Sequence, residues 1–515
     1  GDLPQVVTSS SWWQKSGWVC IEQNSPGGFN FDTFNLYMPD FTATDYRGNT
    51  INSSSIVASH KVTLYYIWAS WCSFSKAFHP TVSSIYQRYK NHSLEIIGLC
   101  SDGTENPVDA ANTIESNNME WPTLMSNPGG ISYSGFPTIM AFDETGKLIF
   151  HSSVTSRDLL PEFLKGILGE GDLPYESSDY SEDGKVYTLQ KASKGNGINV
   201  VLMGDAFSDR QVADGTYEEV MRTAADAFFS EEPYTSFRNL FNVYYVTAIS
   251  KNEGYVDGGS TVFSGYFGSG THVGGDDNKC MQYAATCPGM TDPLMNEVLI
   301  IVMMNSTTYA GTCYFGTSSA YQGDYGRGYG IAYFPIGTSD EDLASVLHHE
   351  AGGHGFAKLE DEYYYESKGT IPSSEISRNI DFRNRYGWGR NVDYTSDPNS
   401  VVWSKFISDS RYASEGLGVY EGACTYYKGA YRPTETSIMV GNVGGFNAPS
   451  REAIYNRIHK LAYGESWQFD YETFVSWDLS RQGRSRSMPS QTKYKPTAPP
   501  VILNQHWENG RLVAN

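Results

Sequence analysis

The chain has 515 residues, enough for two or three ordinary domains, and its 40% hydrophobic and 18% charged residues exclude a disordered protein. Its net charge is −21 and no basic stripe is visible, which excludes a nucleic-acid binder because such proteins need a basic face. No apolar run approaches the ~20 residues of a membrane span, so we expect a protein that is not membrane-spanning.

The first part of the chain, residues 30–170, alternates predicted strands with predicted helices. The apolar runs that we interpret as strands are 62–68, 94–99, 139–142 and 148–151, and the helical stretches are 76–89 and 106–117. This alternation indicates an α/β layer fold. A segment rich in Gly, Ser, Asp and Glu, residues 168–195, marks the expected domain boundary.

A second α/β pattern fills residues 190–480. The predicted strands are 198–203, 241–247, 297–305 and 329–335, and the predicted helices are 216–229, one beginning near residue 340, and 450–461. We expect residues 365–430 to form irregular loops and residues 481–515 to form an extended C-terminal tail. The strand at 329–335 directly precedes the most informative helix and could pair with an extended peptide.

That helix has clear start signals. Thr338 and Glu341 have the spacing of a capping box, and the acidic first turn favours the positive end of the helix dipole. Leu343, Val346 and Leu347 then give an apolar face with helical spacing.

The segment His349-Glu350-Ala351-Gly352-Gly353-His354 follows on the same helix. Zinc peptidases place two neutral imidazoles on one helix face, with a glutamate beside them as the general base. Here the two histidines are five residues apart, which puts them about 140° apart on a regular α-helix. A π-bulge, to which the two glycines adapt easily, would restore the alignment. We therefore predict a Zn²⁺ site with His349 and His354 as ligands and Glu350 as the catalytic base.

A third ligand is expected shortly after the helix. Glu360, Asp361 and Glu362 lie six to eight residues past His354, and a chain that turns back could present any of them to the metal. We choose Asp361 among the three. The competing interpretation is a surface helix end with ordinary histidines.

The zinc segment and its continuation to Leu359-Glu360-Asp361-Glu362-Tyr363 resemble the bacterial IgA peptidase family, metallopeptidase family 64. Further matches are 241–244, 431–434 and 450–454, and Ser437-Ile438-Met439 resembles the Met-turn of metzincin-like enzymes. The resemblance covers residues 195–480. It implies a metzincin-like zinc metalloendopeptidase domain with a mixed sheet and an active-site helix. It also implies a protein or peptide substrate and a secreted, periplasmic or cell-surface location in a bacterium. We expect any signal peptide to have been removed already.

Two positions depart from the family pattern. The zinc segment contains one extra glycine, and Gly441 stands where metzincins carry a tyrosine after the Met-turn. The group that stabilises the oxyanion must then come from elsewhere, and Tyr363, Tyr431 and Arg432 are the candidates.

The first domain resembles thioredoxin-like proteins. Its Trp68-Ala69-Ser70-Trp71-Cys72 is similar to their active-site entry, and Gly135-Phe136-Pro137-Thr138 is similar to their cis-proline loop. Redox cycling in that family needs a second cysteine, which is Ser75 here. We therefore expect a docking domain without redox activity. A catalytically inactive surface binding or scaffold protein, with both sites degraded, remains the alternative to the peptidase.

Overall fold

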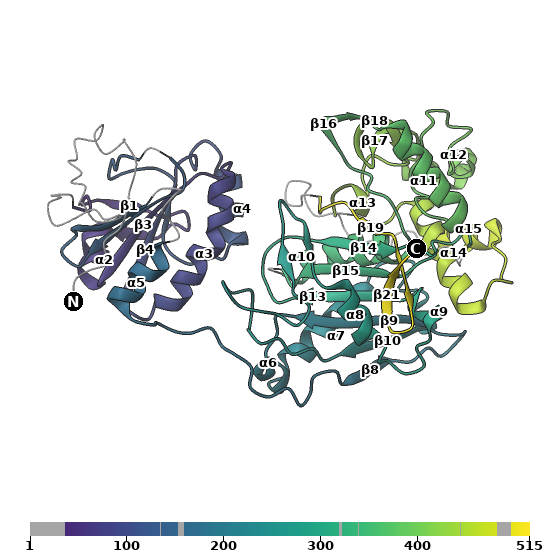
Figure 1. Cartoon of the computed structure of the whole chain (residues 1–515). Coiled ribbons are helices and arrows are strands. Elements are labelled where there is room, and N and C mark those ends of the chain that lie inside the picture. The colour runs from purple at the N-terminus through teal and green to yellow at the C-terminus, as the bar shows by residue number, and fades with distance from the viewer. Residues whose placement is uncertain are drawn as a thin grey trace. The chain divides into compact units, whose positions relative to one another are not determined.

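The computed structural model describes residues 37–133, 135–152, 159–318, 322–337, 339–442, 444–481 and 496–515. The chain divides into two units, which Figure 1 colours from purple to yellow along the sequence. The N-terminal unit ends at Tyr175 and also includes Val256–Gly258, and the C-terminal unit comprises Glu176–Tyr255 and Gly259–Asn515. Both units are α/β, as predicted.

The N-terminal unit is built on a five-stranded sheet in the order β5-β4-β3-β6-β7. Its strands are β3 (Val62–Trp68), β4 (Leu94–Cys100), β5 (Thr123–Leu124), β6 (Thr138–Asp143) and β7 (Leu148–Ser152). The helices are α2 (Ser53–Ser59), α3 (Ser73–Tyr89), α4 (Pro107–Ser116) and α5 (Leu160–Leu168), and β1 (Thr42–Thr44) pairs with β2 (Thr50–Asn52). Every residue of β3 is buried, because the strand lies at the centre of the sheet.

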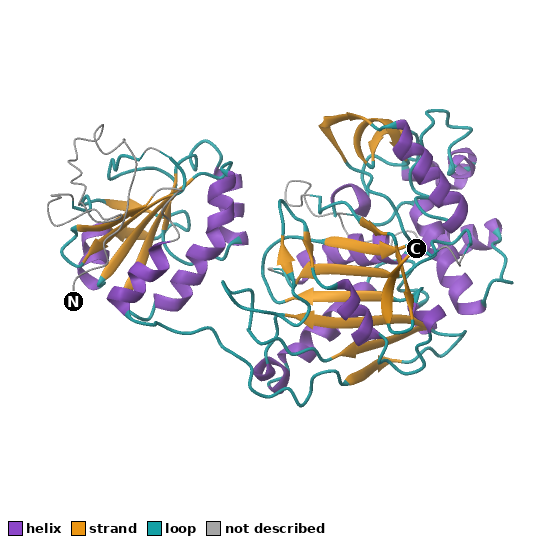
Figure 2. Cartoon of the chain, in the orientation of Figure 1, coloured by secondary structure: helices purple, strands orange, loops and turns teal. Residues whose placement is uncertain are grey.

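A seven-stranded mixed sheet forms the centre of the C-terminal unit, in the order β19-β14-β15-β13-β9-β10-β8 (Figure 2). The strands are β8 (Val186–Gln190), β9 (Ile198–Asp205), β10 (Phe241–Val246), β13 (Leu299–Met304), β14 (Thr312–Gly316), β15 (Gly330–Pro335) and β19 (Val501–Leu503). β10, β9, β13 and β15 are parallel, whereas β14 and β8 run antiparallel to their neighbours β15 and β10.

Side chains of the central strands alternate between two cores, because successive residues of a strand point to opposite faces. Leu299, Ile301 and Met303 pack in one core, while Ile300 and Val302 pack in the other. The first core holds α7 (Thr216–Phe228) and α10 (Asp340–Leu347), and the second holds α8 (Asp277–Ala284). The short elements α6 (Asp209–Ala213), β11 (Tyr266–Phe267), β12 (Val273–Gly274) and α9 (Asp292–Met295) lie in the connections.

The prediction of irregular loops at 365–430 is wrong. The region contains β16 (Tyr364–Thr370), α11 (Ser373–Tyr386), α12 (Ser404–Ser408), β17 (Tyr420–Ala423) and β18 (Thr425–Arg432). The apolar pattern of the sequence did not reveal these elements, because few of their side chains are buried. Six of the seven residues of β16 are exposed, and only Asn379 and Tyr386 of α11 are buried, so neither element has the apolar periodicity on which the prediction relied.

The C-terminal unit also contains α13 (Ile438–Gly441), α14 (Ala448–Tyr463), α15 (Tyr471–Arg481) and two short 3₁₀ helices, Arg238–Leu240 and Ser410–Glu415. The last residues do not form the expected extended tail. Instead β19 joins the large sheet, and β20 (Gln505–Glu508) pairs with β21 (Arg511–Ala514) in a hairpin. The hairpin is held because Trp507 is buried and its backbone exchanges two hydrogen bonds with the side chain of Asn296.

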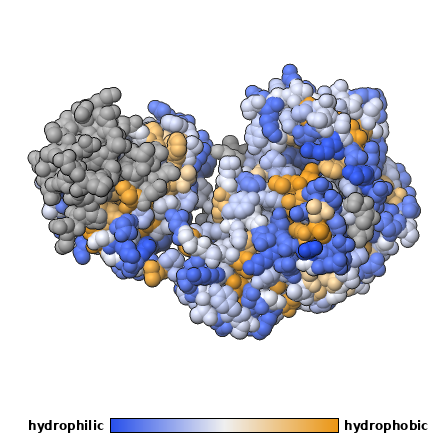
Figure 3. All heavy atoms as spheres, in the orientation of Figure 1, coloured by the Kyte–Doolittle hydropathy of each residue, from blue (hydrophilic) through white to orange (hydrophobic). Residues whose placement is uncertain are grey.

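The face of the C-terminal unit drawn in Figure 3 is mainly hydrophilic, with hydrophobic residues gathered in patches. Among the described residues, none of the helices combines the length and apolar character that crossing a bilayer requires.

Candidate metal centre of the C-terminal unit

The site lies on a helix that changes its winding. α10 begins at the N-cap Ser339, whose hydroxyl accepts the N–H of Asp342 at 3.2 Å. The predicted cap Thr338 lies outside the described residues. At His348 the α-helix gives way to a π-helix that continues to Phe356. The predicted π-helical distortion is thus confirmed, and its wider turn places residues five apart on one side.

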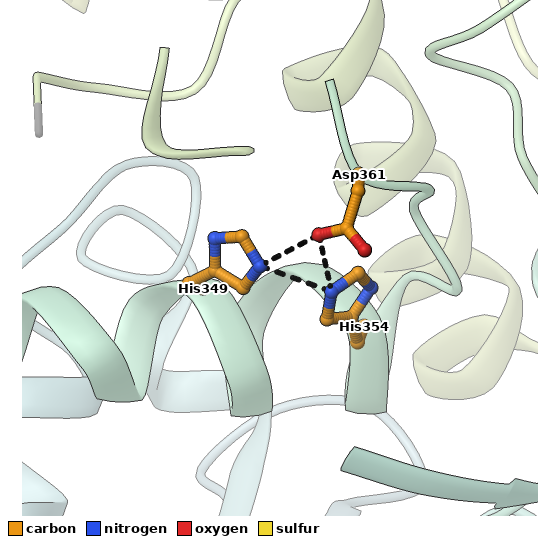
Figure 4. Close-up of side chains that lie close together, drawn as sticks. All are labelled: His349, His354 and Asp361. Atoms are coloured by element: carbon orange, nitrogen blue, oxygen red, sulfur yellow. Dashed lines mark hydrogen bonds and ion pairs between the residues drawn. The ribbon is translucent and has the colours of Figure 1, made fainter. Parts of the chain in front are cut away.

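His349, His354 and Asp361 meet at one point (Figure 4). The Nε2 atoms of the two histidines are 3.0 Å apart, and Asp361 Oδ1 lies 3.0 Å from the first and 3.2 Å from the second. All three side chains are buried. The structure thus brings together the three residues that the sequence analysis selected as ligands.

Hydrogen bonds from the Nδ1 atoms determine which tautomer each of the two histidines adopts. Nδ1 of His349 donates to the Ile438 carbonyl at 2.9 Å, and Nδ1 of His354 donates to the Leu359 carbonyl at 2.6 Å. With these protons on Nδ1, both Nε2 lone pairs face Asp361, which is the tautomer that metal-ligating histidines adopt.

Three lone-pair donors this close together repel one another unless a proton or a metal ion lies between them. Tetrahedral zinc with bonds of about 2.0–2.1 Å would hold its donors about 3.3 Å apart, close to the separations in the trio. Two imidazoles and one carboxylate are also a usual donor set for zinc. The residues present therefore fit this ion.

Glu350 lies beside the trio and is fully buried. Neither of its carboxylate oxygens forms a hydrogen bond of regular geometry with a described residue. Burial raises the pKa of Glu350 to about 7, although the nearby Thr497 hydroxyl acts in the opposite direction. A buried carboxylate without a regular partner is available for a proton from another molecule.

The predicted Met-turn packs beneath the metal centre. The backbone of Ile438 binds His349, and a Cβ added at Gly353 would overlap the sulfur of Met439. The extra glycine of the zinc segment therefore occupies a position where a larger residue would displace the Met-turn.

The two carboxylates that competed with Asp361 do not join the trio. Glu362 accepts hydrogen bonds from the side chains of Asn391, Ser437 and Asn447. Its N–H donates to the carbonyl of Met439 at 2.8 Å, so it links the ligand segment to the Met-turn. Burial raises the pKa of Glu360 to about 7.

Of the three oxyanion candidates, Tyr363 is buried and its hydroxyl donates to the Thr497 carbonyl at 2.7 Å. The Arg432 guanidinium instead donates to the carbonyls of Glu421 and Gly422. The ring of Tyr431 packs against a cluster that includes Trp403. Tyr363 is therefore the candidate whose side chain binds Thr497, a residue that lies beside Glu350.

The expectation that strand 329–335 pairs with substrate is wrong. This strand is β15, which lies between β14 and β13 and has no free edge. Sequence reasoning also missed Gly311 and Thr497, which lie against Glu350. Residues so far apart in the chain offer no local pattern that could have revealed them.

In the N-terminal unit, Cys72 is the N-cap of α3, and its sulfur lies 3.7 Å from the carbonyl of Phe136. The peptide bond between Phe136 and Pro137 is cis, as the resemblance implied. Ser75 is buried on the first turn of α3, and the six described cysteines are all free.

Comparisons with known proteins match both parts of the chain. Residues 187–412 match the family model of IgA Peptidase M64, and residues 60–125 match a model described as Thioredoxin-like. The first match contains Glu350 and the whole His/His/Asp trio.

Relatives were found for the thioredoxin-like part. Thiol-disulfide oxidoreductase ResA of Bacillus thuringiensis subsp. konkukian is 27% identical over 134 residues, covering 25% of this chain and 75% of the relative. ResA of a Bacillus cereus strain is 26% identical over 115 residues, covering 22% of this chain and 64% of the relative.

Solved structures were matched over the same share of the chain. The thioredoxin domain of a thiol-disulfide oxidoreductase from Bacteroides vulgatus has 21% identity and a TM-score of 0.23, covering 26% of this chain and 96% of that one. A thiol:disulfide interchange protein from Chlorobium tepidum has 18% identity and a TM-score of 0.22, covering 26% and 97%. The chain is therefore similar to the IgA Peptidase M64 family at residues 187–412 and to thioredoxin-like proteins at residues 60–125.

Proposed function

We propose that this chain is a zinc metalloendopeptidase that hydrolyses peptide bonds in protein substrates, with His349, His354 and Asp361 as the ligands and Glu350 as the general base. The observation that carries the proposal is the convergence of two Nε2 lone pairs and one carboxylate oxygen within 4.8 Å of one another, next to a buried glutamate. The family match supports peptidase activity.

Each residue has a separate task. The backbone carbonyls of Ile438 and Leu359 hold the two imidazoles in the tautomer that leaves Nε2 free. When bound there, zinc would supply Lewis acidity towards a peptide carbonyl and a water molecule. Glu350 accepts the proton of the attacking water and later delivers it to the leaving amine.

We further propose that the protein acts outside the cytoplasm, as a secreted, periplasmic or cell-surface bacterial enzyme. The support is the family resemblance. The free cysteines of the described residues carry no argument in either direction.

The test combines metal analysis with one substitution. Glu350→Gln keeps the shape of the side chain but removes the base, so we expect it to retain bound zinc and to lose casein hydrolysis by ~10²–10⁴-fold. Zinc content is measured by mass spectrometry and hydrolysis by release of labelled peptides.

Glu341→Gln is the matched control, since Glu341 is exposed on the first turn of α10, two turns before the metal centre. It should leave both measurements unchanged. Undiminished cleavage by Glu350→Gln would remove Glu350 from its proposed role. A zinc-loaded chain that binds peptides but never cleaves them would favour the scaffold alternative.

A further inference from the structure

The C-terminal segment 497–503 lies along the sheet edge nearest the metal centre. Its strand β19 pairs in parallel with β14, with Val501 opposite Tyr314 and Leu503 opposite Gly316. In Figure 1 this is the yellow strand beside β14. The opposite side of β14 pairs with β15, so β19 covers the side of β14 that would otherwise be a free edge.

The pairing continues from β14 towards the catalytic glutamate. The N–H of Ala498 donates to the carbonyl of Gly311 at 3.1 Å, and the hydroxyl of Tyr363 donates to the carbonyl of Thr497 at 2.7 Å. A Cβ added at Gly311 would lie 3.0 Å from Cγ of Glu350. The backbone of residues 497 and 498 is therefore held directly beside the catalytic carboxylate.

These contacts are those that an extended peptide makes when it adds to a sheet edge. The N–H of Ala498 donates to the carbonyl of Gly311, the residue just before β14, and the carbonyl of Thr497 accepts a hydrogen bond from the Tyr363 hydroxyl. Thr497 is fully buried, so its position is not open to solvent or to a second peptide. A substrate backbone and this segment need the same donor and the same acceptor.

We propose that residues 497–503 form a built-in inhibitory strand, which occupies the peptide-binding edge of the peptidase and must leave before a protein substrate can enter. This inference rests on the proposed peptidase function. Once the strand leaves, the Tyr363 hydroxyl and the Gly311 carbonyl become available to the backbone of the substrate.

Two features would let residues 497–503 leave β14 while the residues that follow them stay bound to the C-terminal unit. Pro499 and Pro500 have no N–H and therefore interrupt the ladder between Ala498 and β19. The anchor lies beyond the strand, in the β20–β21 hairpin, where Trp507 is buried and bound to Asn296.

The test measures peptide binding in a background that cannot hydrolyse, so that it does not depend on catalysis. The probe is a fluorescent peptide with the sequence of residues 496–503, and the proteins are the zinc-loaded Glu350→Gln chain at full length and the same chain ending at residue 495. We expect the shortened chain to bind the probe at least 10-fold more tightly, and unlabelled casein peptides to displace it. Equal binding by a folded shortened chain would overturn the proposal.

A second variant covers the case in which the shortened chain does not fold. Ala498→Pro in the full-length Glu350→Gln chain removes the N–H that binds Gly311, and the control Arg511→Pro places a proline at the turn end of β21, outside residues 497–503. We expect several-fold tighter probe binding for Ala498→Pro alone. Identical binding by the two variants would overturn the proposal.

Casein hydrolysis is followed separately, in chains that retain Glu350. The inhibitory strand predicts faster cleavage by the shortened chain or by Ala498→Pro than by the unmodified chain. Improved probe binding without any cleavage would count against the peptidase and still support occupation of the edge by residues 497–503.

Discussion

At the scale of single residues, the geometry of the site depends on the π-helical distortion of the backbone and on a glycine, Gly353, which has no side chain. The π-helix turns His354 towards His349, and Gly353 leaves room for the Met-turn beneath them. A glycine at this place is a packing requirement of the proposed metal centre, and the extra residue of the segment leaves His349, His354 and Asp361 close together.

Gly353→Ala tests that packing. The added methyl group would overlap the sulfur of Met439, so we expect a loss of about 1–3 kcal/mol in stability and weaker zinc binding, measured by chemical unfolding and by zinc titration. Met439→Ala makes room for the methyl group, and the double variant should lose less than the sum of the two single losses. Strict additivity would show that the two residues do not compete for space.

Asp277 offers a pH test away from the metal. Burial raises its pKa to about 7, although the Tyr333 hydroxyl donates to it at 2.8 Å. Because the folded pKa lies above the unfolded value of about 3.9, this group favours folding most below pH 4, and its contribution is lost as the pH rises through 7.

Asp277→Asn removes that titration and keeps an acceptor for Tyr333. We expect equal stability near pH 4 and a gain on the order of 1–2 kcal/mol at pH 8, seen as a higher melting temperature. The control Asp276→Asn changes the neighbouring carboxylate, which caps α8 through the N–H of Lys279 and which asparagine can replace. A pH-independent difference would contradict this account.

At the scale of elements, one buried carboxylate joins three segments. Glu362 binds Ser437 of the Met-turn and Asn447 at the start of α14, and it directly follows the proposed ligand Asp361. The position of Asp361, the proposed third ligand, is thus set by contacts with segments that are more than 70 residues away in sequence.

Glu362→Ala should therefore weaken zinc binding by ~10–100-fold without removing a ligand, because outer contacts orient the ligands. Zinc affinity is measured by competition with a chelator. Glu366→Ala, on the exposed face of β16, is the matched control and should bind zinc normally. Unchanged affinity in Glu362→Ala would show that Asp361 is positioned without this carboxylate.

At the scale of the whole molecule, each unit has its own hydrophobic core. One cluster is confined to residues 41–164, and the others belong to residues 198–507. Separate cores of this size allow each unit to fold alone.

We expect two transitions in calorimetric unfolding, and a fragment of residues 176–515 that keeps zinc and casein hydrolysis. The reciprocal fragment, residues 1–175, should fold but cleave nothing. A single transition together with an insoluble C-terminal fragment would show that the two units depend on each other for folding.

The sequence by itself determined the α/β class, the two-part organisation and the four central strands of the large sheet, because these buried strands carry regular apolar patterns. It did not reveal β8, β14 or β19 of the same sheet. It also determined the need for a π-helix, since five-residue spacing of two histidines has few geometric solutions. Exposed elements such as β16 and α11 lack that pattern, so their existence depends on contacts that only the tertiary structure shows.

Only the tertiary structure decided which carboxylate faces the histidines, because three neighbours in sequence differ in the distant partners that hold them. It likewise decided that β15 is an interior strand and that residues 497–503 cover β14 beside Glu350. Strand order is a property of the whole sheet, and no local pattern encodes which segment lies at its edge.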